Sequence, residues 1–323
     1  MTAPPARKGD MVKVRNPEEI LATLDERGEL DGLPFMPEMV AMCGRSFHVA
    51  ARAERICDTI SWTGSRTMAD TVFLDDLRCN GSGHGGCAAE CRIYWKEAWL
   101  RLATPASPDR QPIDTDARAA LMELVSRHTT QAPGREGEKV RYRCQATQAL
   151  AASAPVSTKD VTSYVREYRV GNVPLARFLR VLARAAVMEP ARKLGLLPHP
   201  PVKGTSTKSV RTPTLDLEPG ELVRVKSRED IEATLNDQGK NRGLWFDREM
   251  LPFCGRELRV RQRVDRLIDE PTGEMIELTS DCVTLDGAVC SGERSTCRWF
   301  CHREIFPYWR EGWLERVPES SGD

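Results

Sequence analysis

The stretch Gly9–Phe35, GDMVKVRNPEEILATLDERGELDGLPF, occurs a second time as Gly220–Phe246, GELVRVKSREDIEATLNDQGKNRGLWF. The two copies align without a gap from 9–58 onto 220–269, at a constant shift of 211 positions. The likeness returns near the end of each copy, where WKEAWL is matched by WREGWL. Internal self-similarity of this kind indicates a duplicated structural module.

The repeated stretch carries the local signals of a short strand followed by a short helix. Val12 and Val14 alternate with polar residues, which is typical of a strand. Asn16 and Pro17 then supply an N-cap and a first helical residue, and Gly28 suits the end of the helix.

The rest of each module is predicted to be mainly β. Phe47–Arg55 and Thr71–Arg78 are rich in β-branched and alternating residues, so we expect two strands there. Trp95 and Trp99 are four residues apart, which predicts that both lie on one side of a final helix. Together these elements favour an α+β fold, with each module a small SH3-like β-barrel carrying helical insertions.

The chain therefore divides into four expected regions. These are a cysteine-rich module at 1–103, a helical middle domain at 104–196, a Pro-rich linker at 197–218 and a second cysteine-rich module at 219–323. Within the middle domain we expect helices over Asp114–Arg127, Lys139–Ala152, Thr158–Arg169 and Val173–Leu194, with Pro190 kinking or ending the last.

Composition limits the classes of protein to consider. Acidic and basic residues balance at 47 each, which argues against a main role in binding bulk nucleic acid or an anionic membrane. The start MTAPPARKGD is polar and no apolar run reaches membrane-spanning length, so we expect a cytoplasmic protein. Eleven cysteines in a reducing compartment favour metal binding or catalysis over disulfides.

The cysteine pattern predicts two metal sites. Cys57 is missing from the second copy, and Cys282, which aligns with Thr71, appears instead. If 57 and 71 face each other across a hairpin, a ligand could change strand and still reach the same point. Each copy then keeps four thiolates, the number that a closed tetrahedral zinc site needs. The two predicted ligand sets are Cys57, Cys79, Cys87 and Cys91, and Cys282, Cys290, Cys297 and Cys301.

Other readings of these residues stay open. Four thiolates also suit an iron–sulfur cluster, although the spacing matches no ferredoxin, and small buried thiols can simply fill a core. Cys43 and Cys254 fall outside both sets and are candidates for core packing, an extra ligand or a reactive thiol. His84 is a candidate extra ligand, and with Cys43 and the loop Gly81–Gly86 it would form the site of an enzyme.

Repeated arginines form a candidate anion site. Arginine suits bidentate contacts with phosphate or carboxylate, although ion pairs that tie strands together are the more common use. The second copy adds a stripe along one strand face, which offers a less favoured nucleic-acid surface. The residues concerned are Arg45, Arg52, Arg256, Arg259, Arg261 and Arg263.

The segment 173–194 mixes apolar and basic residues at helical spacing. A helix of this kind packs in its own domain, grips a protein partner or lies on a membrane surface. A peripheral association with the membrane is therefore one interpretation of this segment.

Three runs carry a resemblance to a known group: LPFMPEMVAMCGRSF at 33–47, CNGSGHGGCAAEC at 79–91 and YWKEAWLRL at 94–102. The chain resembles a family of uncharacterised bacterial proteins built of single or tandem cysteine-rich modules and often encoded near biosynthetic genes. The resemblance implies an accessory or biosynthetic role and supplies no catalytic residues. The second copy lacks the SGHGG loop, which makes the first copy the expected working one.

We therefore expect a zinc-stabilised tandem protein, with two zinc ions per chain, that binds a protein partner in a biosynthetic or membrane-associated complex. A metal- or thiol-dependent enzyme with its site in the first copy is the alternative. Nucleic-acid binding through the arginine strand of the second copy is the third reading.

Overall fold

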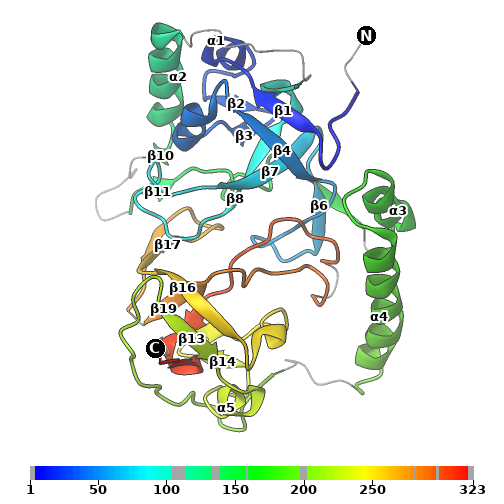
Figure 1. The fold of residues 1–323 in the computed structure, drawn as a ribbon, viewed down its shortest axis with the longest axis vertical. Coiled ribbons are helices and arrows are strands. Elements are labelled where there is room, and N and C mark those ends of the chain that lie inside the picture. Colours follow the sequence, from blue (N-terminus) through cyan, green and yellow to red (C-terminus); the bar gives the residue numbers. More distant parts are fainter. Residues whose placement is uncertain are drawn as a thin grey trace, which may run out of the picture. The chain divides into compact units, whose positions relative to one another are not determined.

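The structure is a computed structural model with mixed α and β elements, many short strands and few helices (Figure 1). It describes residues 4–103, 114–131, 139–157, 159–196, 202–279, 281–295 and 298–318. The chain divides into two compact units, and each unit is assembled from segments that are not contiguous in the sequence. Unit 1 comprises Met1–Phe178, Ile268–Ile276 and Cys297–Arg303, and unit 2 comprises Leu179–Leu267, Glu277–Thr296 and Glu304–Asp323.

Unit 1 is built on a five-stranded antiparallel half-barrel with the order β8-β7-β4-β1-β9. Strand β1 lies between β4 and β9, and its Val12 pairs with Phe47 on one side and with Leu102 on the other. The strands span Met11–Val14 (β1), Ser46–Arg52 (β4), Thr71–Arg78 (β7), Arg92–Lys96 (β8) and Leu100–Leu102 (β9).

The core of unit 1 lies under this sheet. Phe35 meets the rings of Trp95 and Trp99 edge-on, at centroid distances of 6.1 and 5.1 Å. Both tryptophans are fully buried, and such aromatic pairs stabilise a core beyond the area that they bury.

Helices and short paired strands surround this core. Helix α1 (Pro17–Leu21) starts with Pro17, and the Glu19 carboxylate accepts a hydrogen bond of 3.0 Å from the Asn16 N–H. Helix α2 (Thr115–Arg127) packs against α1 (Figure 1). The remaining elements of unit 1 are η1 (Pro37–Met42), η2 (Glu97–Trp99), α3 (Val161–Arg169), the pairs β2 (Glu29–Leu30) with β3 (Leu33–Pro34) and β10 (Thr130–Gln131) with β11 (Arg141–Tyr142), and a small sheet of β5 (Ile56–Cys57), β6 (Ser65–Thr67) and β12 (Ala154–Val156).

Unit 2 contains a second five-stranded sheet with the same order, β20-β19-β16-β13-β21. Its first register pair, Leu222 with Arg259, lies 211 positions after the pair Met11 with His48 in unit 1. The strands span Trp309–Arg310 (β20), Cys282–Leu285 (β19), Glu257–Arg263 (β16), Leu222–Val225 (β13) and Leu314–Arg316 (β21).

Smaller elements complete unit 2. Leu217 is buried in its core, and the backbone N–H groups of Leu215, Asp216 and Leu217 donate to the Glu311 carboxylate. The bounds are α5 (Arg228–Glu232), η3 (Leu251–Phe253), η4 (Glu311–Trp313), and the pair β14 (Lys240–Asn241) with β15 (Leu244–Trp245). The pair β17 (Arg266–Ile268) with β18 (Met275–Glu277) lies where the chain passes between the units.

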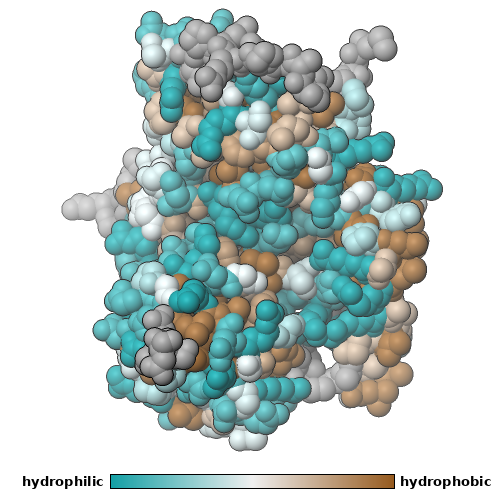
Figure 2. Space-filling model, viewed as in Figure 1, coloured by the Kyte–Doolittle hydropathy of each residue, from teal (hydrophilic) through white to brown (hydrophobic). Residues whose placement is uncertain are grey.

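Helix α4 (Leu175–Lys193) continues through Pro190 to Lys193, so the helix does not end at that proline. It exposes Leu175, Leu179 and Val187, and Figure 2 shows hydrophobic residues gathered over this helix. No helix in the described part of the chain is both long and apolar enough to cross a membrane.

Several local predictions are confirmed and three are wrong. The helices expected in Asp114–Arg127, Thr158–Arg169 and Val173–Leu194 are present as α2, α3 and α4. The helix expected over Lys139–Ala152 is wrong, because the segment forms β11 and then turns.

The tryptophan helix is also wrong. Trp95 lies in β8 and Trp99 in η2, and the change from strand to 3₁₀ turn is what brings both rings inward. Finally, Cys57 pairs with Ser65 and Thr71 with Lys96, so the expected pairing of 57 with 71 is wrong.

Candidate metal centre

Three side chains meet under the first sheet: Glu38, Cys79 and His84. Glu38 follows Pro37 in the first turn of η1, and Cys79 comes directly after β7. His84 belongs to the loop 80–91 that connects β7 to β8. Helix η1 and the segment that follows β7, which are distant in the sequence, thus place their polar groups at one point.

The geometry of this centre is compact. The Cys79 Sγ donates to Glu38 Oε1 at 2.8 Å, and His84 Nδ1 lies 3.3 Å from the same oxygen. The candidate ligand atoms of all three residues lie within 4.8 Å of one another. The side chains of His84 and Glu38 are only 1% and 4% exposed, so water has little access to them.

The contact made by Nε2 of His84 determines whether Nδ1 carries a proton or a lone pair. Nε2 lies 3.2 Å from the carbonyl oxygen of Arg143, and a carbonyl can only accept a hydrogen bond. The proton of a neutral ring is therefore on Nε2, which leaves a lone pair on Nδ1 facing the Glu38 carboxylate. A metal-bound histidine commonly donates its other N–H to a backbone carbonyl in this way.

The centre contains buried polar atoms without a hydrogen-bond partner among the described residues. They are His84 Nδ1 and Glu38 Oε2. Buried polar atoms of this kind are uncommon in folded proteins and call for an explanation such as a bound ion. Thiolate, imidazole and carboxylate are all ligands of zinc, and the residues therefore fit that ion.

Burial controls the ionisation of the thiol and the carboxylate. It raises the pKa of Cys79, and the Glu38 carboxylate and the nearby Cys91 act in the same direction. Burial would also raise the pKa of Glu38, but the contacts with His84 and Cys79 outweigh it and lower that pKa. A cation at this point would reverse the effect on the thiol, because a coordinating thiol is deprotonated.

Glycines in the loop make this close approach possible. A Cβ on Gly83 would lie 2.9 Å from Glu38 Oε2 and 3.0 Å from Pro37 Cγ. A Cβ on Gly81, whose φ is +70°, would clash with the backbone of Cys87. Glycine at positions 81 and 83 therefore allows the loop to bring His84 against Glu38.

The position 211 residues after Glu38 shows a different solution. Glu249 is also a buried glutamate, but its carboxylate accepts hydrogen bonds from the loop after Cys290. Its Oε2 accepts from the N–H and hydroxyl of Ser291 at 3.2 and 2.7 Å, and its Oε1 from the N–H of Arg294 at 2.6 Å. The N–H and hydroxyl of Ser295 complete the set at 2.8 and 3.1 Å. Five protein donors thus satisfy Glu249.

The described residues do not gather the first predicted set, Cys57, Cys79, Cys87 and Cys91, at one point. Among them, Glu38, Cys79 and His84 form the one group of three or more candidate ligands within 4.8 Å of one another. The Cys87 Sγ instead accepts from the Ile268 N–H at 3.4 Å, and the Cys91 carbonyl accepts from the Cys79 N–H at 2.8 Å. Cys297 lies outside the described residues.

Cys57 lies beside Cys301 in unit 1. Both are buried, and the Cys57 N–H donates to Cys301 Sγ at 3.1 Å. The hydrogen bond between the two thiols lowers the pKa of Cys57 to about 6, helped by Arg303 and Arg298 against the effect of burial. Arg303 donates to the Cys57 carbonyl at 3.3 Å and pairs with Glu270 at 2.9 Å.

The remaining cysteines have the features of core residues. Burial raises the pKa of Cys43 to about 11 and that of Cys282 to about 11, so both are protonated at neutral pH. Cys254 is half-buried and its pKa is also raised by burial. Cys290 is half-buried, and its N–H donates to the Ile305 carbonyl at 2.8 Å.

The predicted anion-binding arginines make contacts within the chain. Arg52 pairs with Glu97 at 2.6 Å, Arg261 with Asp286 at 3.1 Å and Arg263 with Glu311 at 2.9 Å. The other three contact neighbouring groups: Arg45 the Phe47 ring, Arg256 the Phe253 ring and Arg259 the Gly220 carbonyl. Their charge is therefore partly used to tie strands and loops together.

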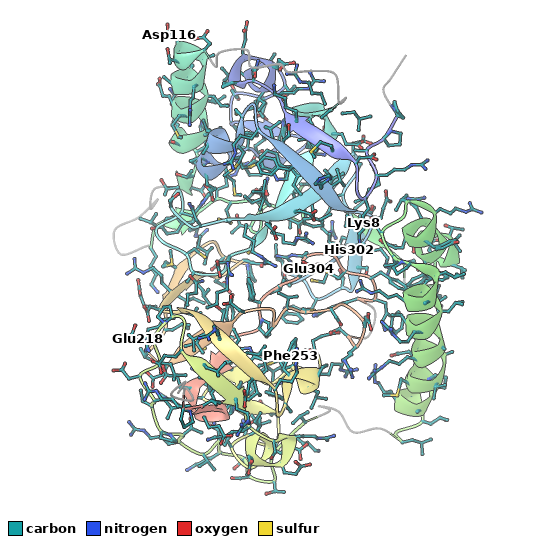
Figure 3. The ribbon with its side chains drawn as sticks, viewed as in Figure 1. Lys8, Asp116, Glu218, Phe253, His302 and Glu304 are labelled. Atoms are coloured by element: carbon teal, nitrogen blue, oxygen red, sulfur yellow. The ribbon has the colours of Figure 1, made fainter. Side chains whose placement is uncertain are left out.

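Two further residues complete this picture. His302, labelled in Figure 3, lies with Nε2 2.9 Å from Glu167 Oε2 in a buried contact.

Glu38, which the sequence reasoning missed, could have been found from the repeat, because a glutamate followed by methionine recurs as Glu249.

No protein-family model, no curated protein and no solved structure matches this chain.

Proposed function

We propose that this chain is a zinc-stabilised binding protein with a single metal centre, formed by Glu38, Cys79 and His84. The observation that carries the proposal is the orientation of His84: its Nε2 faces the Arg143 carbonyl, and its Nδ1 lone pair therefore faces a carboxylate and a thiol. A cation between these groups would satisfy the atoms that lack partners. The mixed nitrogen, oxygen and sulfur set favours zinc over an iron–sulfur cluster, which is held mainly by thiolates.

The proposed role of this zinc is to order the glycine loop. The side chains of His84 and Glu38 are almost completely buried, whereas a catalytic zinc needs a position that substrate can reach. The centre would connect η1, the end of β7 and the loop 80–91, and through the Arg143 carbonyl it would also support the segment after β11.

The matching strand orders and registers support two modules of common origin, each a small SH3-like barrel. In this proposal the second module is a metal-free counterpart, because serine donors satisfy Glu249. The proposal retains helix α4 as the surface for a protein partner, since it exposes Leu175, Leu179 and Val187.

One observation favours a second candidate, a metal-dependent enzyme. Three protein donors leave the fourth position of a tetrahedral zinc open, as in catalytic sites. The two candidates differ in access: an open position would let a small anion such as cyanide or azide bind a cobalt-substituted centre and shift its visible spectrum. A spectrum that does not change would favour the structural role.

Elemental analysis of the purified chain tests the metal proposal. We expect one zinc ion per chain, lost in Glu38→Ala and His84→Ala and retained in the matched control Glu249→Ala. Circular dichroism of each variant shows whether it has folded. Two zinc ions per chain, or loss of zinc in Cys290→Ser but not in His84→Ala, would contradict the proposed centre. Either result would favour the four-thiolate sets instead.

A further inference from the structure

Unit 1 contains a cavity of about 480 Å³, lined by four segments of that unit. They are residue 27 after α1, 128–131 at the end of α2 and in β10, 141–148 from β11 onward, and 270–273 from the second half of the chain. The volume is within the usual range for small-molecule sites.

The walls of this cavity are held by backbone hydrogen bonds. The Tyr142 N–H donates to the Gly273 carbonyl at 2.6 Å, and the Arg143 N–H donates to the Thr129 carbonyl at 2.8 Å. Gly273 has a φ of +73°, and a Cβ there would lie 2.8 Å from the Tyr142 carbonyl oxygen. Three of the four segments are thus fixed against one another before any ligand binds.

Among the described residues that line the cavity, two positive charges remain after internal pairing is taken into account. Arg143 pairs with the buried Glu29, and Glu270 pairs with Arg303, so these charges are already compensated. Arg27 and Arg141 also line the cavity, and within the described part of the chain neither guanidinium has an acidic partner. Within the described lining, two arginines without an acidic partner favour an anion with a charge near −2.

The other lining groups are mostly hydrogen-bonding. Thr130, Gln131 and Gln148 contribute hydroxyl and amide groups, and Pro271 is the main apolar contribution. A purely hydrophobic ligand would leave such groups without partners, which costs free energy. The site therefore suits a polar ligand.

We propose that this cavity binds a small, polar phosphate ester, with Arg27 and Arg141 holding the phosphate and the amide and hydroxyl groups holding the rest of the molecule. A phosphate monoester carries a charge between −1.5 and −2 at neutral pH and presents three acceptor oxygens to the guanidinium groups. Guanidinium groups suit such oxygens because their N–H donors form a rigid fork.

The cavity is physically connected to the metal centre. The Arg143 carbonyl is the group that accepts from His84 Nε2 at 3.2 Å, and Gly85 packs against the Tyr142 hydroxyl. Zinc would thus hold one wall of the cavity in place. This coupling rests on the proposed function, whereas the phosphate site itself does not.

Isothermal titration calorimetry of the full-length chain tests the phosphate site, with glucose 6-phosphate as the probe and glucose and citrate as comparisons. We expect binding of glucose 6-phosphate and none of glucose. Arg27→Ala with Arg141→Ala should weaken the affinity by more than about tenfold. The control Arg118→Ala removes an exposed arginine of α2 outside the cavity and should not change it.

Three results would overturn the proposal: no heat with glucose 6-phosphate or inorganic phosphate, equal affinity in the double variant, or tighter binding of citrate, which would indicate a polycarboxylate. Elemental analysis of the same samples separates the two proposals. Phosphate-ester binding by a chain that holds no zinc would contradict the metal centre and leave the phosphate site standing. A zinc-loaded chain that binds no phosphate ester would do the opposite.

Discussion

Glu38 and Glu249 occupy equivalent positions in the two copies of the repeat but have different environments. Glu249 accepts five hydrogen bonds from its own loop, whereas Glu38 faces a thiol and a histidine lone pair. The same residue type is therefore a structural acceptor in unit 2 and a candidate metal ligand in unit 1. The loop that follows Cys79 in unit 1, or Cys290 in unit 2, supplies the partners of the glutamate and so decides between the two roles.

This difference predicts that the loss of stability on substitution by glutamine depends on zinc for Glu38 and not for Glu249. Glu249→Gln places an NH₂ group against N–H donors and leaves buried donors without an acceptor, so it should lower the free energy of unfolding by about 1–3 kcal/mol. Zinc should make no difference to that loss. Glu38→Gln should cost stability in the zinc-loaded chain and little after chelation. Urea denaturation with and without a chelator measures both, and an equal loss for Glu38→Gln under the two conditions would contradict the prediction.

Cys57 gives a prediction about pH. Its pKa in the folded chain is about 6, below the ordinary thiol value of about 9. A depressed pKa contributes stability that is fully present above pH 9 and is lost as the pH falls toward 6. The unfolding free energy of the native chain should thus rise from pH 6 to 9 relative to that of Cys57→Ala.

Cys144→Ala is the control for this measurement. Burial raises the pKa of Cys144 to about 11, so its thiol is protonated in the folded state throughout that range. Urea denaturation at pH 6, 7.5 and 9 gives the comparison. If native chain and Cys57→Ala change in parallel with pH, the Cys57 thiolate has no role in stability.

At the level of single residues, the sequence identifies the thiol and histidine of the centre but not its carboxylate. Cys79 and His84 stand out because their residue types are metal ligands and they lie five positions apart. Glu38 is far from them in the sequence, in a short apolar helix, and only the fold brings it close. Cys57 was expected to join the same centre, but its strand pairs with Ser65 and turns it toward Cys301.

At the level of elements, the loop 80–91 depends on glycines for contact rather than for flexibility. Gly83 has no room for a side chain, because Glu38 and Pro37 already occupy the space that a Cβ would need. A residue with a Cβ would push the loop away and move His84 with it.

Gly83→Ala should therefore weaken zinc binding while the rest of the unit stays folded. We expect a loss of about tenfold or more in zinc affinity, measured by competition with a chromophoric chelator. Ser82→Ala, an exposed change in the same loop, is the control and should leave the affinity unchanged. Unchanged affinity in Gly83→Ala would show that the loop does not need this close contact.

Element prediction succeeded where the pattern was local and failed where two local patterns conflict. Helix α2 has an N-cap at Asp114 whose side chain accepts from Asp116 and Ala117, and the sequence predicts it well. The tryptophan pair has helical spacing, yet β-pairing of Val72 with Trp95 places the first ring in a strand. Tertiary pairing overrides spacing there, because both rings reach the core by a strand followed by a 3₁₀ turn.

At the level of the whole chain, the sequence predicts two similar sheets but not how the chain is shared between the units. Arg55 shows the consequence: it is fully buried and donates to the Trp299 carbonyl at 3.0 Å and to the Ser163 hydroxyl at 2.7 Å. Trp299 belongs to the second half of the sequence and to unit 1 of the structure. Periodicity describes neighbours along the chain, so it cannot show which unit a long loop joins.

This sharing predicts that residues 1–218 alone form an incomplete unit 1. Such a fragment lacks Trp299, Cys301 and Arg303, so Arg55 and Cys57 lose buried partners. We expect it to unfold at a clearly lower urea concentration than the same unit in the full chain, followed by the signal of Trp95 and Trp99. Addition of residues 219–323 as a separate chain should restore part of the loss. A fragment as stable as the full chain would show that the two segments contribute nothing.

The two segments that unit 1 takes from the second half of the chain, 268–276 and 297–303, also have a genetic consequence. Neither half of the gene can be deleted, exchanged or shuffled as an independent cassette, because a defect in the distal half would appear in the folding of the proximal one. A substitution at Arg303 would therefore impair the folding of unit 1, although Arg303 lies in the second half of the sequence. Second-site substitutions that suppress the defect should be sought among its contacts, such as Thr59 and Cys57.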